Sequence, residues 1–398
     1  MLPPVRAAEA SPPRHPFAQT VPAHDGSHGR AVKEVATIFR VGVRAFDLAL
    51  ARPLRVGGQV LARRTGLLVI AEDGEGHAGV GEASPLPGLH REDFDGAAAE
   101  LLALAPHLEG TAIPVGCAAL DGAFESWLGP HSLNPSVRCG IEGAVLSLLA
   151  DRAGTSVSRL LAAGPANRVR VNGLLDGEPG AVIEEAARLA GEGYAALKIK
   201  VGRRGPLEEA ELVAAVRSRV GAAVALRLDA NRAWDLTTAL GFAERVGPAA
   251  PAYIEEPVRD PLDLPLFVHH AGIPVALDET LLPFTPETPP PLHGVAALIL
   301  KPSVLGGYER AAAWARVARR EGREAVVSAA FPSAVGLALD AAFAAALAPE
   351  GIHGLGTAAA FAEDLCRTPF APLGGAIDAG GQPFKPGDFA LERTRVLR

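Results

Sequence analysis

The sequence predicts an α/β protein in which a (β/α)8 barrel follows a smaller α+β domain. From about Val169 onward, short apolar segments typical of strands alternate with amphipathic helical segments, and eight such strands fit within about 200 residues. This alternation predicts a parallel sheet, and eight repeats of it predict a closed barrel. Before that point strand-like segments come first and helical segments second, which is typical of an α+β unit.

The composition narrows the classes of function. The 398 residues are 48% hydrophobic and 21% charged, which is ample for a large core. The net charge of −7 and the pI near 5.9 argue against nucleic acid or an anionic membrane as a partner. No apolar run approaches the roughly 18 residues that span a bilayer. Three scattered cysteines, Cys117, Cys139 and Cys366, form no CxxC and predict free thiols, so we expect a cytoplasmic protein.

Shifts in composition suggest the domain boundaries. Residues 1–31 are rich in Pro, Ala and His without a continuous apolar stretch, which favours a disordered tail over a secretory signal, and a cleaved targeting peptide stays open. We expect an α+β domain over 32–137 and the barrel over 138–365. The Gly- and Pro-rich segment 366–398 does not continue the repeat, and we expect it to pack on the first domain and complete it.

The N-terminal domain contains a predicted hairpin. The extended segments are 38–50 and 66–83, and the helical segments that follow are 93–105 and 140–154. Asp73-Gly74 interrupts the second extended segment and predicts its turn. Gly74, Gly76 and Gly79 also fit GxGxxG, but a dinucleotide fingerprint needs a helix directly after that loop. A strand follows here, so we interpret the glycines as part of the hairpin.

The barrel strands are short and mostly apolar. They are VRVNGL, YAALKIKV, VALRLDA, AYIEEP, PVALDE, ALILKP, EAVVSA and GIHGLG, in this order along the chain. Amphipathic helices such as 180–191, 207–220 and 307–322 separate most of them. The unit between Glu279 and Val295 is the weakest, because its prolines exclude a regular helix.

Ionisable residues occupy the same place in five consecutive strands. Lys200, Asp229, Glu255, Asp278 and Lys301 each stand at the C-terminal end of a strand, one βα unit apart. That end of a barrel is where such enzymes keep their active sites. Surface charges placed by chance would not keep this register, so we expect the five groups to converge.

The converging groups predict metal-assisted chemistry. Three carboxylates on successive strands repel one another and require a cation. Oxygen ligands suit Mg²⁺, with Mn²⁺ as the alternative. The ion would bind a substrate carboxylate and stabilise an enediolate, while a desolvated lysine, Lys200 or Lys301, takes the α-proton. We therefore expect a small-molecule carboxylate as substrate.

Neighbouring polar residues have two possible roles each. Glu255 and Glu256 face opposite sides of a strand, and we assign Glu255 to the cavity and Glu256, with Glu279, to ion pairs. Arg227 shares the face of Asp229 and is a candidate for orienting Lys200 or a substrate carboxylate. Asn231 is a candidate for supporting the metal or the substrate, although both it and Arg227 could be structural. His353 fits a satisfied core or rim histidine better than a catalytic partner.

Several motifs resemble a known family. LKIKVG, LRLDANRAW, YIEEP, VALDET and LILKPS, in this order, are similar to the enolase superfamily, muconate-lactonising subgroup. GEASPLPG, VRCGIE, DANRAW, KPSVLGGYERAA and VVSAAF more narrowly resemble the o-succinylbenzoate synthases of menaquinone and phylloquinone biosynthesis. The resemblance covers about 32–368. It implies a modified, TIM-like barrel with a capping domain, and syn-dehydration of 2-succinyl-6-hydroxy-2,4-cyclohexadiene-1-carboxylate.

The same resemblance implies roles for individual residues. The implied metal ligands are Asp229, Glu255 and Asp278. The implied catalytic residues are Lys200 as the base, Lys301 as a cation–π stabiliser of the ring and Lys198 as a counter-charge. The candidate substrate contacts are Ser84, Gly88, Arg227, Asn231, Ser328 and Ser333. The loop Ser84–Gly88 is expected to belong to a cap that closes over the substrate. Many relatives have a Glu-Ser pair where this chain has Pro332-Ser333, so the site near strand seven is expected to differ.

Other activities fit the same residues. Two lysines that flank an ion would also serve an N-acylamino acid racemase, a dipeptide epimerase or a cycloisomerase. A metal-independent lyase that forms a Schiff base on Lys301 is an alternative of another class. A third is a non-catalytic barrel that binds a ligand.

Overall fold

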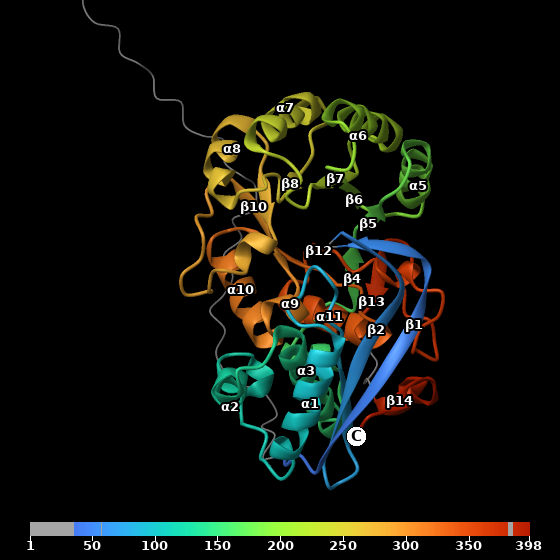
Figure 1. Ribbon diagram of the computed structural model, residues 1–398, viewed down its shortest axis with the longest axis vertical. Helices are drawn as coiled ribbons and strands as arrows, with labels where there is room; N and C mark the ends of the chain where they lie inside the picture. Colours follow the sequence, from blue (N-terminus) through green and yellow to red (C-terminus); the bar gives the residue numbers. More distant parts are fainter. Residues whose placement is uncertain (1–35, 57, 381–384) are drawn as a thin grey trace, which may run out of the picture. The chain divides into compact units, whose positions relative to one another are not determined.

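The computed structural model describes residues 36–56, 58–380 and 385–398. Residues 34–398 form one compact unit, which is the part shown in colour in Figure 1. The expected tail, 1–31, lies outside the described residues. The boundary expected at 137/138 falls inside a helix of this unit and stays a prediction.

The N-terminal strands form a four-stranded antiparallel sheet in the order β14-β1-β2-β3. The strands are β1 (Arg40–Val56), β2 (Gln59–Glu72), β3 (Ala78–Ala83) and β14 (Arg395–Val396). Asp73 makes the predicted turn between β2 and β3, because its Oδ1 accepts hydrogen bonds from the backbone N–H of Glu75 and of His77, each at 2.9 Å. A strand follows Gly74 and Gly76, so the hairpin is confirmed.

Two helices, α1 (Phe94–Leu108) and α3 (Pro135–Arg152), cover one face of this sheet. The short helix α2 (Ala123–Leu128) lies between them in the chain. Asp93 caps α1 by accepting a hydrogen bond from Gly96 N at 2.8 Å. The backbone of α3 lies directly on β3, since a Cβ added at Gly79 would be 2.1 Å from Ala144 O. Only glycine allows this approach.

Eight strands close into a barrel. The first consists of two consecutive segments, β4 (Arg168–Val171) and β5 (Gly173–Leu175). The other seven are β6 (Ala196–Lys200), β7 (Ala225–Asp229), β8 (Tyr253–Glu255), β9 (Val275–Leu277), β10 (Val295–Leu300), β11 (Glu324–Val327) and β12 (Ile352–His353). β5 to β11 form one parallel sheet, while β4, which continues into β5 through Asn172, pairs with β12. Backbone hydrogen bonds from Asn172 N to His353 O (2.9 Å) and from Gly354 N to Val327 O (2.8 Å) complete the ring. All eight expected strands are confirmed.

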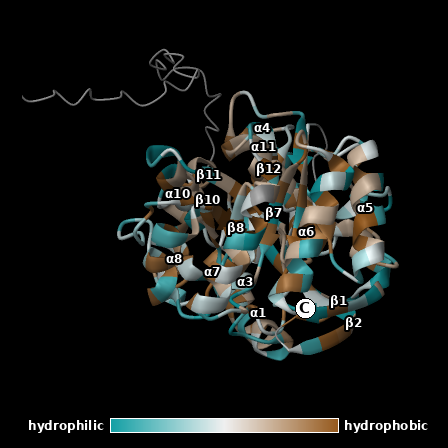
Figure 2. Ribbon diagram, turned by 90° about the horizontal axis from the view of Figure 1, so that it is seen from above, coloured by the Kyte–Doolittle hydropathy of each residue, from teal (hydrophilic) through white to brown (hydrophobic). Residues whose placement is uncertain are grey.

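Helices surround the barrel strands. They are α4 (Val157–Leu161), α5 (Pro179–Gly191), α6 (Pro206–Val220), α7 (Leu236–Val246), α8 (Leu264–Ala271), α9 (Pro302–Leu305), α10 (Tyr308–Arg320) and α11 (Ala334–Leu347). Figure 1 shows α5 to α8 following one another around the outside of β5 to β8. Hydrophobic and hydrophilic stretches alternate along α5 and α6 (Figure 2), as expected of helices with one face on a core. The described segment 279–294 contains a short 3₁₀ helix (Glu279–Leu281) and several turns but no α-helix, as its prolines predict.

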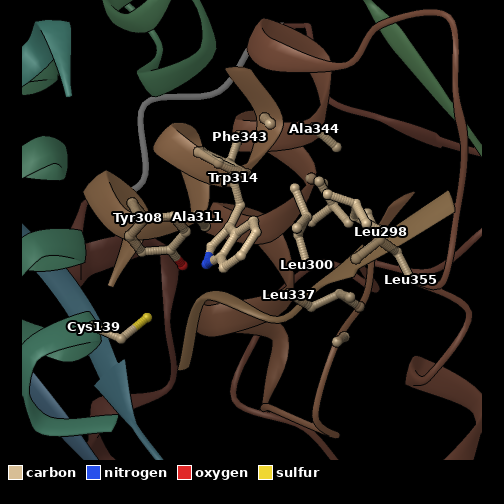
Figure 3. Packing of buried hydrophobic residues seen from close by; sticks show 14 of the residues in the cluster. Cys139, Leu298, Leu300, Tyr308, Ala311, Trp314, Leu337, Phe343, Ala344 and Leu355 are labelled. Atoms are coloured by element: carbon tan, nitrogen blue, oxygen red, sulfur yellow. The ribbon is translucent and has the colours of Figure 1, made fainter. Parts of the chain in front are cut away.

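A dense apolar core fixes β10. Figure 3 shows Trp314 of α10 and Phe343 of α11 beside Leu298 and Leu300 of β10. The side chains are buried, and Phe343 has no exposed surface. This packing holds the end of the strand from which Lys301 emerges.

The C-terminal segment contacts both parts of the compact unit. Its strand β13 (Ala376–Asp378) pairs with β4 of the barrel, and β14 pairs with β1 of the N-terminal sheet. The expectation that this segment packs on the first domain is thus met at β14, and β13 adds a barrel contact that the sequence did not suggest.

Candidate active site

Three carboxylates meet at the C-terminal end of the barrel. Asp229 ends β7, Glu255 ends β8 and Asp278 directly follows β9. The parallel register places Lys200 beside Asp229 and Asp229 beside Glu255, so these groups lie at equal height. All three carboxylates are almost fully buried. The predicted convergence of strand-end charges is therefore seen in the structure.

Two lysines of β6 contact the first two carboxylates. Lys198 Nζ lies 2.9 and 2.8 Å from the two oxygens of Glu255 and 2.8 Å from Asp229 Oδ2. Lys200 Nζ donates to Asp229 Oδ2 at 2.6 Å and to Asn231 Oδ1 at 2.7 Å. Asn231 N also donates to Asp229 Oδ1 at 3.1 Å, so Asn231 supports both members of that pair.

Lys301 pairs with the third carboxylate at the other end of the row. Its Nζ donates to Asp278 Oδ2. Because Lys200 stands on β6 and Lys301 on β10, the two amines flank the acidic row from opposite ends. This is the placement that the sequence predicts.

Burial and mutual repulsion shape the electrostatics. Burial, followed by the charge of Asp229, raises the pKa of Glu255 to about 8. Burial also raises the pKa of Asp278 to about 6, although Lys301 opposes the shift. Burial by itself would raise the pKa of Asp229, but Lys198 and Lys200 lower it below the usual range. The acidic row therefore favours additional positive charge.

The donor set fits a divalent ion. Carboxylate oxygens are the ligands that Mg²⁺ and Mn²⁺ prefer, and the raised pKa values of Glu255 and Asp278 indicate that the lysines alone do not fully balance this cluster. Oε2 of Glu279, next to Asp278, is also buried and has no hydrogen-bond partner among the described residues. Asp229, Glu255 and Asp278 are the residues that would hold the ion.

A second acidic group is a weaker metal candidate. Asp73, Glu75 and His77 offer ligand atoms within 4.8 Å of one another at the β2–β3 turn. Arg152 already forms ion pairs with Asp73 and Glu75, however. Its guanidinium supplies the positive charge that a metal would bring.

Strained backbone surrounds the barrel mouth. Asn231 (φ 44°), Arg232 (φ 59°), Glu256 (φ 43°) and Phe331 (φ 53°) are left-handed residues that follow β7, β8 and β11. Such conformations cost about 1–3 kcal/mol each and persist where the surrounding contacts impose them, often at functional sites. The rim of the barrel is thus held in an unfavourable but defined conformation.

Glu256 is structural, as expected. It accepts hydrogen bonds from Arg232 Nε at 2.9 Å and from the backbone N–H of Asp278 (2.8 Å) and of Thr280 (2.7 Å). It thereby fixes the backbone of a proposed metal ligand. The similar expectation for Glu279 is wrong, because no ion pair of Glu279 occurs within the described part of the chain.

Arg227 does not reach the mouth, contrary to expectation. Its guanidinium donates to Ile352 O at 2.5 Å and to Glu324 Oε1 at 2.7 Å, and it lies over the Tyr253 ring at 5.3 Å. Ile352 and Glu324 begin β12 and β11, at the opposite end of the barrel. Two residues along a strand share a face but differ by about 7 Å in depth, and this difference separates Arg227 from Lys200.

Ser84 and Ser333 were expected to contact substrate, but both are buried against Glu82. Ser84 Oγ donates to Glu82 Oε1 at 2.6 Å, and Ser333 Oγ donates to Glu82 Oε2 at 2.6 Å. Both hydroxyl groups are therefore engaged in joining the N-terminal domain to the β11–α11 loop. No motif or spacing in the sequence indicated that Glu82 would be their shared partner.

The other expected contacts lie in different places. Ser328 follows β11 at the barrel mouth and is buried. Gly88, with φ 79°, lines a pocket of about 250 Å³ with Gln59, Thr65 and His90. His353 is a satisfied core histidine, as expected, because Nδ1 accepts from Val327 N (3.0 Å) and Nε2 contacts Ala348 O (2.9 Å).

The chain is similar in sequence to proteins of a known family. A family model described as enolase C-terminal domain-like matches residues 181–387. The chain belongs to the enolase superfamily. It is 33% identical to the o-succinylbenzoate synthase of Citrobacter koseri, over 75% of this chain and 84% of that protein. It is 37% identical to the chloroplastic protein PHYLLO of Arabidopsis thaliana, over 62% of this chain but only 16% of PHYLLO.

Solved structures give the same fold. The dipeptide epimerase of Enterococcus faecalis, solved with Mg and the dipeptide L-Leu-L-Tyr, superimposes with a TM-score of 0.78 at 21% identity. The match covers 89% of this chain and 99% of that protein. This enolase-superfamily member thus has the modified (β/α)8 barrel and the N-terminal α+β capping domain that the sequence predicts. No helix in the described ranges is long and apolar enough to cross a membrane.

Proposed function

We propose that this chain is an o-succinylbenzoate synthase that dehydrates 2-succinyl-6-hydroxy-2,4-cyclohexadiene-1-carboxylate. The observation that carries the proposal is the row of Asp229, Glu255 and Asp278 between the amines of Lys200 and Lys301. Curated relatives named o-succinylbenzoate synthase support it. On this proposal the protein acts in the cytoplasm, in menaquinone or phylloquinone biosynthesis.

The charges of the site support a dianionic substrate. With all three lysines protonated, the formal charges of the three lysines and the three carboxylates sum to zero, although repulsion between the carboxylates persists. A bound divalent ion would add two positive charges, which match the two carboxylates of the proposed substrate. When bound, such an ion would supply positive charge that makes the carbon next to a coordinated carboxylate more acidic.

Lys200 is the proposed base. In its neutral amine form it takes the proton from the ring carbon that bears the carboxylate, and the electron pair of that C–H bond begins the new ring double bond. The C–O bond at the neighbouring carbon then breaks. Lys200 returns its proton to the departing hydroxyl group, so water leaves from the face that lost the proton and the ring becomes aromatic. The products are o-succinylbenzoate and one water molecule.

Two further lysines stabilise charge in this scheme. Lys301, at the opposite end of the acidic row, would face the ring and stabilise its transient negative charge by a cation–π contact. Lys198 lies below Glu255 and Asp229 and would limit the repulsion between them. Asn231 holds the Lys200 amine by a 2.7 Å hydrogen bond and would orient it toward the substrate.

A turnover assay with the cyclohexadiene substrate tests this proposal. Purified protein with Mg²⁺ is incubated with the cyclohexadiene substrate, and formation of o-succinylbenzoate is followed. Turnover is expected to stop on chelation, to return with Mg²⁺ or Mn²⁺, and to fall by about 10²–10⁴-fold or more in Lys200→Ala. Arg203→Ala, a change at an exposed neighbouring cation, is the control. Full turnover by Lys200→Ala would contradict the proposal.

Racemisation or epimerisation is the second candidate. The amines of Lys200 and Lys301 lie on opposite sides of the acidic row, and two-base racemisation needs two bases placed in this way. A dipeptide epimerase also has the same fold. The test is incubation with N-acylamino acids and dipeptides in ²H₂O. Turnover of these compounds without turnover of the cyclohexadiene would replace the first proposal. Borohydride trapping on Lys301 would instead support a Schiff-base lyase.

A further inference from the structure

Arg64 joins three segments of the protein from a fully buried position. It is only 1% exposed. Its guanidinium donates to Thr65 O at 2.8 Å, to Pro85 O at 2.9 Å, to Ser84 O, and across to Phe331 O at 3.0 Å. A single cap residue thus binds the loop after β3 and the loop after β11 together.

Two other cap residues, the buried Glu82 and the partly buried His90, reinforce the same junction. Glu82 accepts hydrogen bonds from Ser333 N at 2.9 Å and from Gly336 N at 3.0 Å, in addition to the two serine hydroxyl groups. His90 accepts from Leu86 N at 2.9 Å and contacts Ser303 O, in the short helix α9 after Lys301, at 3.2 Å. The loop Ser84–Gly88, which was expected to close over the substrate, is therefore anchored to the loop after β11 and to α9.

The burial of Arg64 is costly. No carboxylate lies within 4 Å of its guanidinium in the described part of the chain, so backbone carbonyl groups are its hydrogen-bond partners. Burial lowers the pKa of Arg64 to about 10, and Glu82 offsets only part of that effect. A buried charge that is satisfied by several carbonyl groups tolerates little displacement. The junction thus fixes the position of Phe331 O.

Phe331 is the unusual residue on the barrel side of this junction. It has a left-handed φ of 53°, which is strained for a bulky side chain. Ala329, Ala330, Pro332 and Ser333 around it are buried, but Phe331 is only half-buried. It follows β11, whose Val327 pairs with Leu300, the residue before Lys301. A large apolar side chain thus stays partly uncovered at the rim, next to the strand of Lys301.

We propose that Phe331 forms an apolar wall of the substrate site, against the ring of the substrate, and that Arg64 is a positioning residue that holds Phe331 there through its carbonyl group. The inference rests on the proposed function, since it deepens the description of that site.

The test compares two cap arginines, the buried Arg64 and the partly buried Arg152. Arg64→Met removes the guanidinium from the junction, while Arg152→Met removes one from the β2–β3 turn, where Arg152 pairs with Asp73. Arg64→Met is expected to raise KM for the cyclohexadiene substrate by about tenfold while kcat changes little, the pattern of lost uniform binding. Arg152→Met is expected to lower the unfolding midpoint without changing KM. Equal KM values for the two variants would overturn the positioning role.

A double-mutant cycle tests whether Arg64 acts through Phe331. Phe331→Ala is expected to raise KM by a similar factor, and the double variant is expected to be no worse than Phe331→Ala. If the increases in KM from the two substitutions added up in the double variant, the inference that Arg64 acts through Phe331 would be overturned. If Arg64→Met fails to fold, Phe331→Ala alone tests the inference. An unchanged KM in Phe331→Ala would then contradict the role of Phe331 as a wall of the substrate site.

Calorimetric titration with o-succinylbenzoate separates this inference from the proposed function. If the wild type does not convert the cyclohexadiene but binds o-succinylbenzoate, the proposed function fails, and weaker binding by the Phe331 and Arg64 variants still supports the inference. If the wild type is active and both variants bind and react normally, the inference alone fails. A wild type that neither binds nor reacts would overturn both.

Discussion

Both carboxylate oxygens of Glu255 lie within hydrogen-bond distance of Lys198 Nζ, at 2.9 and 2.8 Å, inside the barrel. An ammonium group at the base of the site thus partly neutralises a carboxylate that faces two others. The acidic row is held together by this contact, but it stays under repulsion, as the raised pKa of Glu255 indicates. This balance leads to the first prediction.

Glu255→Gln is expected to remove ion binding without destabilising the ion-free protein. The substitution removes one of three mutually repelling charges, while Lys198 keeps its 2.8 Å contact with Asp229. We expect the free energy of unfolding without metal to change by less than about 1 kcal/mol, because loss of repulsion offsets loss of the contact. Thermal unfolding with and without Mg²⁺ measures both effects. A stabilisation by Mg²⁺ equal to that of the wild type would contradict the ligand assignment.

Asn231→Gly is expected to lower kcat by about tenfold. The side-chain amide holds Lys200 Nζ at 2.7 Å, and glycine removes that contact while it accepts the left-handed backbone without strain. Steady-state kinetics gives the effect. Ser132→Gly, at another left-handed position on an exposed turn, is the matched control and should keep full activity. An unchanged kcat in Asn231→Gly would show that Lys200 is oriented by Asp229 alone.

Gly81→Ala is expected to destabilise the capping domain strongly. A Cβ at residue 81 would lie 2.0 Å from Gly140 O and 2.5 Å from Ala144 N, so α3 would have to move away from β3. Overpacking of this kind costs about 1–3 kcal/mol or more. Chemical denaturation measures it, with Gly180→Ala, where an added Cβ meets nothing within 4 Å, as the control. Equal stability of the two variants would contradict the close packing.

His353 is expected to make stability fall in mild acid. Burial lowers its pKa to about 4, below the value near 6.5 of an unfolded histidine. The unfolded state therefore takes up the proton first as the pH falls, so stability present above pH 6.5 is lost progressively down to about pH 4. The loss is up to roughly 3 kcal/mol. Denaturation of His353→Asn at several pH values should show a shallower slope, whereas replacement of the exposed His107 should leave the slope unchanged.

The main features of the site could be predicted from the sequence because they repeat. Five consecutive barrel strands each contribute one charged residue at the same height, so spacing alone indicates that Lys200, Asp229 and Lys301 approach one another. The lack of a regular helix in the proline-rich segment after β9 could be predicted equally well, because proline excludes a regular helix whatever surrounds it. Features of this kind depend on local sequence and on one repeated geometry.

The junction between the cap and the barrel could not be predicted in the same way. Ser333 and Glu82 are 251 residues apart, and no periodicity links them. Arg64 lies in β2 between the exposed residues Arg63 and Thr65, and its depth depends on the loop after β11. The position of Arg227 was predicted wrongly for a related reason. The sequence of a strand indicates which face a side chain occupies, but the depth of that side chain in the barrel depends on how all the strands are arranged around the ring. Pairings between distant segments decide these positions.

The pairing of β14 with β1 has a consequence during synthesis. Arg44 Nε meets Thr394 Oγ1, 350 residues later in the chain, and Arg44 pairs with Val396. At a ribosomal rate of about 5–20 residues per second, the outer edge of the first strand waits roughly 20–70 seconds for its neighbour. An unpaired strand edge is a template for association between nascent chains. The edge of β1 is therefore protected only after β14 has left the ribosome.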